Sequence, residues 1–342
     1  MRNSYRVGRQ ENGKPVKTLI IIANRISNQN DEGATKATIE FIKSLKGERI
    51  LVSTPEKNFS LNGVKVVRSP LLRIRMIEDF ICALVTIYQV ARIKADRVYY
   101  FPLCFPNTFP GILHQLHAYI LSKISKDFIE ILYQSGEPGL LFKMFSRFRI
   151  SVTSSEGFKE LKKHGLTVSH FPLLYPKPQR EYDKKSLRKK YGFKKDDFVA
   201  LHVGHLQKSR GLDVLLGLSE LMPDIKTLIV LSSMKTKLKI NLRQRNTYII
   251  DSYIADIYEI YKLADVYVFP IRVKGAALDT PLSILEAKEM NLPIIASNLT
   301  NIREVLSDYS KVYFLEIDST EEMAKNTAKH IKQIRASRYE ED

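Results

Sequence analysis

The sequence predicts an α/β protein made of two domains, each built on a parallel sheet. Short apolar runs with the character of strands alternate along the chain with helical segments, which implies parallel sheets covered on both faces. The 342 residues are more than one hydrophobic core usually supports. The proline-containing, charged stretch PLLYPKPQREYDKK is the best linker in the chain. We therefore place a domain boundary near Pro176 and expect domains at residues 1–176 and 177–342.

Composition and charge set the class of protein and of partner. With 44% hydrophobic and 27% charged residues the chain reads as a soluble globular protein. Its two cysteines, Cys82 and Cys104, give neither a disulfide framework nor a zinc spacing, and the polar N-terminus lacks a signal-peptide core, so we expect a cytoplasmic protein. The net charge of +17 favours anionic partners such as nucleotide sugars, phosphorylated lipids, an anionic membrane or nucleic acid. No nucleic-acid-binding motif is recognisable.

The first domain is expected to open with a buried strand at Val16–Ala23, followed by the polar loop NRISNQNDEG and an amphipathic helix. Further strands are expected at residues 49–53, 64–68, 97–101 and 128–133. His114 and His117 fall in a helical segment at a spacing that is poor for a metal site, so we interpret both as structural.

The segment SPLLRIRMIEDFICALVTIYQVARIK, residues 69–94, is long, helical and rich in both basic and large apolar residues. Two interpretations stay open. It packs against the sheet like an ordinary α/β helix, or it lies on a membrane surface as a basic amphipathic helix.

The second domain is expected to begin with the basic helix KKSLRKKYGF and the strand FVALHVG. Strands follow at residues 225–231, 247–251, 267–271, 293–297 and 311–317. Ser319 and Glu322 have the spacing of a capping box for a final helix.

The stretch Tyr267–Ser297 reads as a strand, a loop, a helix and a second strand, which is a βαβ unit. We predict Thr280 as the N-cap of the helix and Pro281 as its first residue, so that the amides of Leu282 and Ser283 face an anion such as a phosphate. At about 100° per residue Asp279, Ser283 and Glu286 share one face, beside Leu282 and Leu285. The Glu286 carboxylate then has the position to accept hydrogen bonds from two ribose hydroxyls; the alternative is a solvated surface carboxylate.

The sequence LDTPLSILEAKEMNLPIIAS followed by NIREVL resembles the C-terminal signature of glycosyltransferase family 4, whose members are retaining enzymes of the GT-B fold. In that family an E-x7-E motif occupies this loop and helix, and its second Glu, which binds the nucleotide ribose, corresponds to Glu286. The first Glu is replaced by Leu278, and Asp279 is the nearest carboxylate.

The stretch HLQKSRGLDVLLGL resembles the phosphate loop of the same family, in which an Arg and a Lys hold the diphosphate. The Arg position is His205 and the Lys position is Arg210, with Lys208 as a substitute cation. The resemblance also implies that Gly33, in the first loop of the N-terminal domain, approaches the donor phosphates. Family members carry a His near the transferred sugar, whereas here the corresponding loops offer Ser135 and Glu137, which also suit a plain Gly and Pro turn.

The resemblance covers nearly the whole chain and implies two Rossmann-like doubly wound domains facing a cleft. Residues 1–176 would bind the acceptor, residues 177–342 would bind the nucleotide-sugar donor, and the last helix would cross back to the first domain. The implied activity is transfer of a sugar with retention, without metal or cofactor, from a nucleotide-diphosphate sugar to a glycan, a lipid carrier or a small molecule. The alternative is a degenerate member that binds the nucleotide sugar without turnover. The catalytic residues, the sugar and the base are not predicted.

Overall fold

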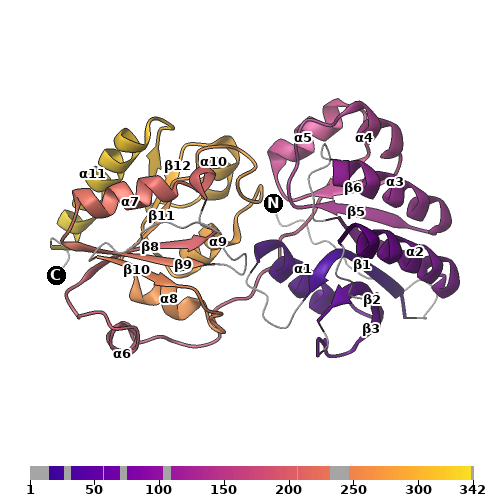
Figure 1. The fold of residues 1–342 in the computed structure, drawn as a ribbon, viewed down its shortest axis with the longest axis horizontal. Helices are drawn as coiled ribbons and strands as arrows, with labels where there is room; N and C mark the ends of the chain where they lie inside the picture. The colour runs from indigo at the N-terminus through magenta and orange to yellow at the C-terminus, as the bar shows by residue number, and fades with distance from the viewer. Residues whose placement is uncertain are drawn as a thin grey trace. The chain divides into compact units, whose positions relative to one another are not determined.

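The computed structural model describes residues 15–26, 32–56, 58–69, 75–102, 109–205, 207–231 and 246–339, and within these the chain forms two compact units. The first unit ends at Tyr175, and the second runs on from Pro176 and also includes residues 32 and 33. Each has its own parallel sheet, flanked by helices (Figure 1). GT-B is the architecture with two such Rossmann-like domains, so the predicted fold class is confirmed.

The described part of the first unit contains a seven-stranded sheet in the order β3-β2-β1-β4-β5-β6-β7. Its strands are β1 (Lys17–Ile26), β2 (Glu48–Pro55), β3 (Val64–Arg68), β4 (Arg97–Phe101), β5 (Phe128–Leu132), β6 (Arg149–Val152) and β7 (Val168–His170). Its helices are α1 (Gly33–Ser44), α2 (Arg75–Ile93), α3 (Phe109–Ile124), α4 (Leu140–Phe145) and α5 (Ser155–Lys163).

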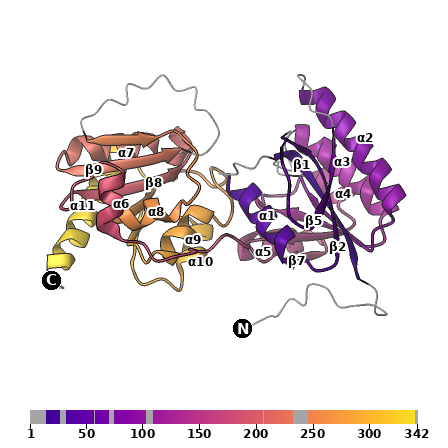
Figure 2. The same ribbon diagram turned by 90° about the horizontal axis from the view of Figure 1, so that it is seen from below.

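Helices cover both faces of this sheet, as the alternation of strands and helices predicts. One face packs against Val90 of α2, Ala118 of α3, Phe142 of α4 and Leu161 of α5. On the other face Phe41 of α1 packs on aromatic side chains of β4, and Figure 2 shows α1 on the side opposite to α2, α3 and α4.

The first strand is longer than its apolar run. β1 continues through residues 24–26, which we had assigned to the polar loop, because its pairing with β2 resumes at Arg25 and Ile26 after a register shift. After the shift, the backbone of this polar segment pairs with β2 again, although its side-chain pattern does not indicate a strand.

The described part of the second unit contains a six-stranded sheet in the order β10-β9-β8-β11-β12-β13. Its strands are β8 (Phe198–Gly204), β9 (Ile225–Leu231), β10 (Thr247–Ile250), β11 (Val266–Phe269), β12 (Ile294–Ser297) and β13 (Val312–Leu315). Its helices are α6 (Lys184–Lys190), the 3-10 turn η1 (Lys208–Arg210), α7 (Leu212–Leu221), α8 (Tyr258–Leu263), α9 (Leu282–Glu289), α10 (Thr300–Leu306) and α11 (Thr320–Tyr339).

The final helix stays with the second unit. The Ser319 hydroxyl accepts from the Glu322 amide at 3.2 Å, which is half of the predicted capping box. α11 then packs against α7 and β13, and Ile331 and Ile334 lie in the same hydrophobic cluster as Leu215. The expected return of this helix to the first domain stays a prediction.

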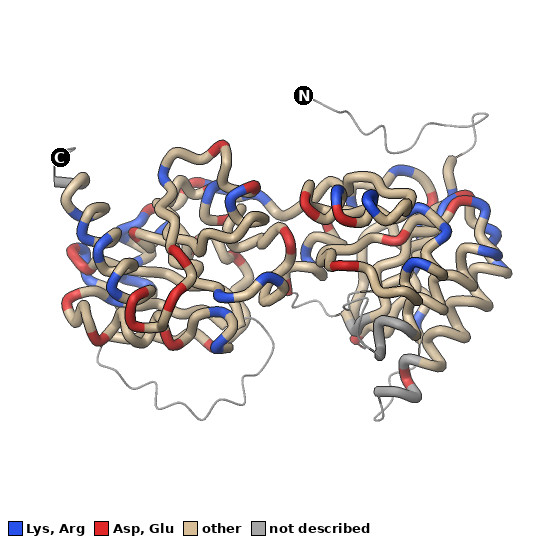
Figure 3. The backbone as a smooth tube through the Cα atoms, turned by 90° about the horizontal axis from the view of Figure 1, so that it is seen from above, with Lys and Arg blue, Asp and Glu red and all other residues tan. Residues whose placement is uncertain are grey.

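In the described parts of the chain, no helix is long and apolar enough to cross a membrane. Basic residues are distributed over both units (Figure 3).

Candidate functional site

The candidate site lies in the second unit, where the strand order reverses. β8 and β11 are neighbours in the centre of the sheet, and the chain builds outward from them in opposite directions, through α7 to β9 and through α9 to β12. Such a switch point leaves a crevice at the carboxyl ends of the two strands, which is where open α/β sheets bind ligands. The two loops that flank it are those with the predicted phosphate and ribose residues.

The loop after β8 has a backbone that only glycine permits. Gly211 has a φ of +74°, and a Cβ atom there would collide with the carbonyl oxygen of Pro270, which follows β11. The Arg272 amide donates to the Ser209 carbonyl at 2.9 Å. The two loops of the crevice are thus fastened to one another through their backbones.

Arg210 turns back over the end of β8. Its Nη1 atom would be 3.2 Å from a Cβ atom at Gly204, the last residue of the strand, so the missing side chain of Gly204 leaves room for the guanidinium. Burial lowers the pKa of Arg210, and its Nε atom is buried without a hydrogen-bond partner in the described structure. A buried cationic donor in this position suits a phosphate oxygen.

The two other predicted cations lie in the same loop. His205 follows β8 directly and, like Arg210, is half-buried, while Lys208 on η1 is exposed. The Nε atom of Arg210 is buried and has no hydrogen-bond partner among the described residues.

His202, which the sequence analysis missed, lies below this loop in β8. Its side chain is 1% exposed, and Nδ1 donates to the Val268 carbonyl of β11 at 2.9 Å. Burial, with the nearby positive charge of Arg210, lowers the pKa of His202 to about 4, so the ring is neutral at physiological pH. A single polar residue inside the apolar strand FVALHVG was the available signal.

The helix of the βαβ unit begins one residue later than predicted. Pro281, with φ −69° and ψ 123°, is the N-cap of α9, and its carbonyl accepts from the Ile284 amide at 3.2 Å. Thr280 therefore lies outside the helix, one residue before its N-cap, and the N-cap Pro281 makes no side-chain cap hydrogen bond. The amides of Leu282 and Ser283 still precede the first helical hydrogen bond, as expected.

Glu286 is not a solvated residue. Its side chain is 3% exposed, and the Tyr261 hydroxyl on α8 donates to Oε2 at 2.8 Å. Burial first, and then the Glu286 charge, raise the pKa of Tyr261 well above its ordinary value. One carboxylate oxygen is thereby held in a fixed direction by a neutral phenol.

The predicted faces of α9 need a further correction. The buried residues of the helix are Leu282, Ile284, Glu286 and Ala287, whereas Leu285 is only half-buried. Asp279 precedes the helix, so its position does not follow the helical period; it is 3% exposed, and its carbonyl accepts from the Asn301 side chain at 3.0 Å.

Two further contacts, also missed from the sequence, hold the site together. The Tyr267 hydroxyl on β11 reaches the Val203 carbonyl at 3.4 Å and the Ser283 side chain, joining the ends of both strands to α9. Arg272 pairs with Asp213 at 3.1 Å and contacts Thr320, which ties the β11 loop to the starts of α7 and α11.

The remaining predicted residues are next to helices α1 and α4. Gly33 is the first residue of α1 and is grouped with the second unit, and Glu137 is exposed in the segment before α4. His117 Nε2 and the Thr86 hydroxyl share a hydrogen bond of 2.7 Å, and burial lowers the pKa of His117 to about 3. Both observations agree with the structural role predicted for this residue. Among the described residues no group of His, Cys, Asp and Glu could hold a metal ion.

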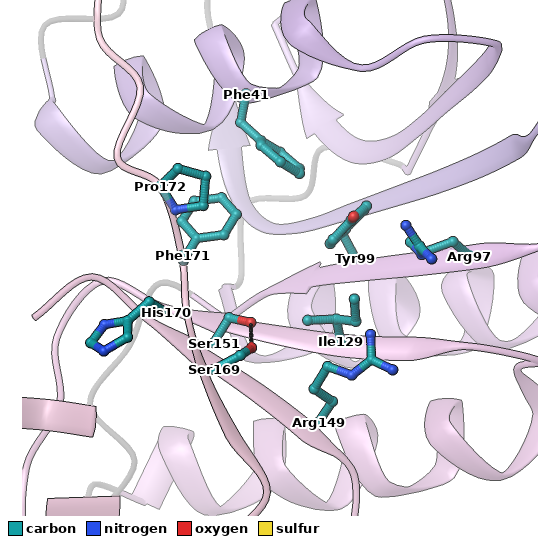
Figure 4. Close-up of a pocket in the computed structure, with 10 residues that line it drawn as sticks. All are labelled: Phe41, Arg97, Tyr99, Ile129, Arg149, Ser151, Ser169, His170, Phe171 and Pro172. Carbon is teal, nitrogen blue, oxygen red and sulfur yellow. Dashed lines mark hydrogen bonds between the residues drawn. The ribbon is translucent and has the colours of Figure 1, made fainter. Parts of the chain in front are cut away.

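A pocket of about 120 Å³ opens on the α1 side of the first sheet (Figure 4). Its two guanidiniums, Arg97 and Arg149, begin β4 and β6, and both pair with Asp127, at 2.7 and 3.6 Å. The hydroxyls of Ser151 and Ser169 are 2.7 Å apart. The arginines lie at the amino ends of their strands, away from the carboxyl edge where ligands of such sheets bind, and we assign them no ligand.

A comparison with protein families gives one match for this chain. Residues 183–340, which contain the whole candidate site, match the family described as glycosyl transferases group 1. No curated protein sequence matches the chain.

Solved structures show the same fold over almost the full length. A glycosyltransferase from Rickettsia africae ESF-5 has 14% identity and a TM-score of 0.67, covering 94% of this chain and 88% of its own. WaaG, a glycosyltransferase involved in lipopolysaccharide biosynthesis, has 15% identity and a TM-score of 0.68, covering 93% and 92%. HepE from Anabaena, solved with UDP and glucose, has 14% identity and a TM-score of 0.65, covering 93% and 91%.

Proposed function

Residues 183–340 are a domain of the glycosyl transferases group 1 family and make the protein a glycosyltransferase; from this we propose that it takes its sugar from a nucleotide-diphosphate donor bound in the crevice between β8 and β11. The observation that supports the proposal most is the half-buried Arg210 side chain at the switch point of the sheet, whose buried Nε atom lacks a partner in the described structure. HepE, which shares the fold, was solved with UDP and glucose.

The donor would extend across the crevice from one loop to the other. The diphosphate would accept hydrogen bonds from Arg210 and from the first amides of α9, those of Leu282 and Ser283. The Glu286 carboxylate, held by Tyr261, would accept from the ribose hydroxyls. The residues 177–342 would thus bind the donor, and the residues 1–176 would bind the acceptor.

In the reaction, these residues would stabilise the leaving group. As the bond between the sugar and the diphosphate breaks, negative charge grows on the departing phosphate oxygen. A guanidinium and helix amides that are already in place stabilise that charge without reorganising. Retention of configuration is part of the proposal because the family resemblance implies it. The acceptor is a glycan, a small molecule or a lipid carrier, and the last of these would bring the enzyme to a membrane.

The test is the release of free nucleoside diphosphate. The full chain is incubated with UDP, GDP and ADP sugars, with and without candidate acceptors, and each donor is also screened for a rise in melting temperature. A donor at 100 times its dissociation constant adds about 2.7 kcal/mol to the free energy of unfolding. We expect one donor to stabilise the protein and to be consumed in the presence of an acceptor.

Two other outcomes have definite meanings. Stabilisation without release under every acceptor condition would favour the degenerate, non-catalytic member, to which the departures at Leu278 and His205 also point. If no nucleotide sugar stabilises the protein and none is cleaved, the donor proposal is contradicted.

A further inference from the structure

His202 lies where the pairing of the two central strands of the second unit ends. Within the described sheet, β8 pairs with β9 as far as Gly204, but with β11 only at Val266 and Tyr267. The Val268 carbonyl, one residue beyond the last of these pairs, accepts from Nδ1 of His202 at 2.9 Å. The imidazole thus takes the place of a ladder hydrogen bond at the point where the crevice between β8 and β11 begins.

The other ring nitrogen of His202 lies near Arg210. A carbonyl oxygen only accepts hydrogen bonds, so Nδ1 carries the proton, and Nε2 of the neutral ring then presents a lone pair. Nε2 would be 3.5 Å from a Cβ atom at Gly204, and the Arg210 Nη1 atom would be 3.2 Å from the same atom. Both nitrogens therefore border the space that glycine leaves at the end of β8. Among the described residues, none forms a hydrogen bond with Nε2.

The two side chains also interact electrostatically. Burial is the largest cause of the low pKa of His202, about 4, and the positive charge of Arg210 lowers it further. The effect is mutual, because a neutral ring with a lone pair attracts the guanidinium, whereas an imidazolium would repel it. Strand β8 thus gives Arg210 an uncharged acceptor as its neighbour, where most positions of the strand carry apolar side chains.

We propose that His202 is a positioning residue of the donor site, which orients the Arg210 guanidinium toward the diphosphate through the lone pair of Nε2. The inference rests on the proposed function, because the diphosphate is part of the donor placed in this crevice. Nδ1 fixes the imidazole to β11, and Nε2 acts on Arg210. The alternative is a buried histidine that only satisfies the Val268 carbonyl.

Two substitutions separate the two ring nitrogens. The side-chain amide of His202→Asn can still donate to the Val268 carbonyl, but it ends short of the Nε2 position. The longer side chain of His202→Gln places an amide oxygen at the Nε2 position and gives up the hydrogen bond to Val268.

Ser219→Ala is the matched control for a loss of stability in the same unit. Ser219, on α7, is buried, and its hydroxyl donates to the Thr227 hydroxyl of β9 at 2.8 Å. Neither residue is among those predicted to contact the donor. Titration calorimetry of UDP and GDP into the full chains gives the affinities, and melting temperatures are measured alongside.

We expect His202→Asn to melt close to wild type and to bind the nucleotide at least about fivefold more weakly, and His202→Gln to melt lower with an affinity within about a factor of two. In an Arg210→Ala background, His202→Asn should no longer change the affinity, because the residue through which it acts is gone. Ser219→Ala should lower the melting temperature alone.

The inference is overturned if His202→Asn weakens binding by the same factor with and without Arg210, or if it binds like wild type. A loss of affinity in His202→Gln, or a comparable loss in Ser219→Ala, would overturn it as well. These results leave the proposed function standing, since wild type still binds the nucleotide. If wild type binds neither UDP nor GDP, the proposed function and this inference fail together.

Discussion

At the scale of single residues, the three cations predicted for the phosphate loop differ in exposure and in charge. Arg210 and His205 are half-buried and Lys208 is exposed; Arg210 lies over Gly204 with a buried Nε atom and a guanidinium that is always charged. Burial strengthens the interaction of a cation with a phosphate and reduces screening by salt. Arg210 should therefore contribute most to diphosphate affinity.

Replacing these residues one at a time tests that order. At pH 8 we expect Arg210→Ala to lower affinity for UDP roughly tenfold to a hundredfold, since hydrogen bonds to charged groups contribute about 1.5 to 3 kcal/mol. His205→Ala and the exposed control Lys208→Ala should cost less. Titration calorimetry gives the three constants, and a larger loss from His205→Ala than from Arg210→Ala would show that the loop is mapped wrongly.

Glu130, on β5, is a buried acid outside the candidate site. Its side chain is fully buried, Oε1 accepts from Gln115 at 2.8 Å, and Oε2 has no hydrogen-bond partner within the described structure. Burial raises the pKa of Glu130 from 4.5 to about 8. The folded state thus holds a proton that the unfolded state has already lost above pH 4.5.

The sign of the pH dependence follows from this difference. The stabilisation by the protonated carboxyl is complete below pH 4.5 and is lost as the pH rises toward 8. Glu130→Gln, which cannot ionise, should exceed wild type in free energy of unfolding at pH 8 by an amount on the order of a few kcal/mol, with a smaller difference at pH 5. Urea unfolding at both pH values measures it. The exposed control Glu137→Gln should follow wild type, and a Glu130→Gln profile parallel to wild type would contradict the assignment.

What the sequence reveals about single residues depends on how local their contacts are. Arg210 and Glu286 were predicted as site residues because each lies in a short motif with fixed neighbours, and these assignments stay predictions. The burial of Glu286 was missed because its partner Tyr261 is 25 positions away and on another helix. His202 was missed for the same reason, since its hydrogen bond joins two strands that become neighbours only in the sheet.

At the scale of elements, the turn from β8 into α7 is the part of the site with the strictest backbone. Gly211 combines a left-handed φ with close contact to Pro270, whereas Gly192, after α6, has a similar φ of +79° and no atom within 4 Å of a Cβ position. Comparing alanine variants at the two positions therefore separates the destabilisation caused by a positive φ from that caused by the collision with Pro270.

We expect Gly192→Ala to cost about 1 to 2 kcal/mol of unfolding free energy, the ordinary price of a left-handed residue with a Cβ. Gly211→Ala should cost roughly 1 to 3 kcal/mol more, because the added carbon meets backbone. It should also weaken UDP binding, because the loop that holds Arg210 must shift. Equal losses of stability in the two variants, seen by denaturant unfolding, would mean that the contact with Pro270 relaxes freely.

Element boundaries were the least predictable feature at this scale. Strands made mostly of apolar residues, such as β8 and β9, lie where the sequence places them. The start of α9 differs because Thr280 and Pro281 both satisfy the rules for a helix start, and only the extended ψ of Pro281 decides between them. The last residues of β1 were missed because they follow a polar stretch and stay in the sheet only through their pairing with β2.

At the scale of the whole molecule, the alternation of strands and helices was sufficient to predict two parallel sheets, and a proline-containing linker indicated where one ends. The order of strands, with its switch points, is a tertiary property that the pattern alone does not give. The course of α11 illustrates the limit: an amphipathic helix fits any apolar surface, and here the packing of Ile331 and Ile334 beside α7 determines which one it covers.

The central claim, that the crevice between β8 and β11 binds a nucleotide-diphosphate sugar, is tested most directly by titrating UDP and GDP into wild type and Glu286→Gln. The substitution keeps an oxygen that can accept from Tyr261, so the melting temperature should change little. It removes the charge and replaces one acceptor with a donor, so affinity for the cognate nucleotide should fall roughly tenfold to a hundredfold. An affinity within about a factor of two of wild type, or a variant that merely unfolds at lower temperature, would contradict the account.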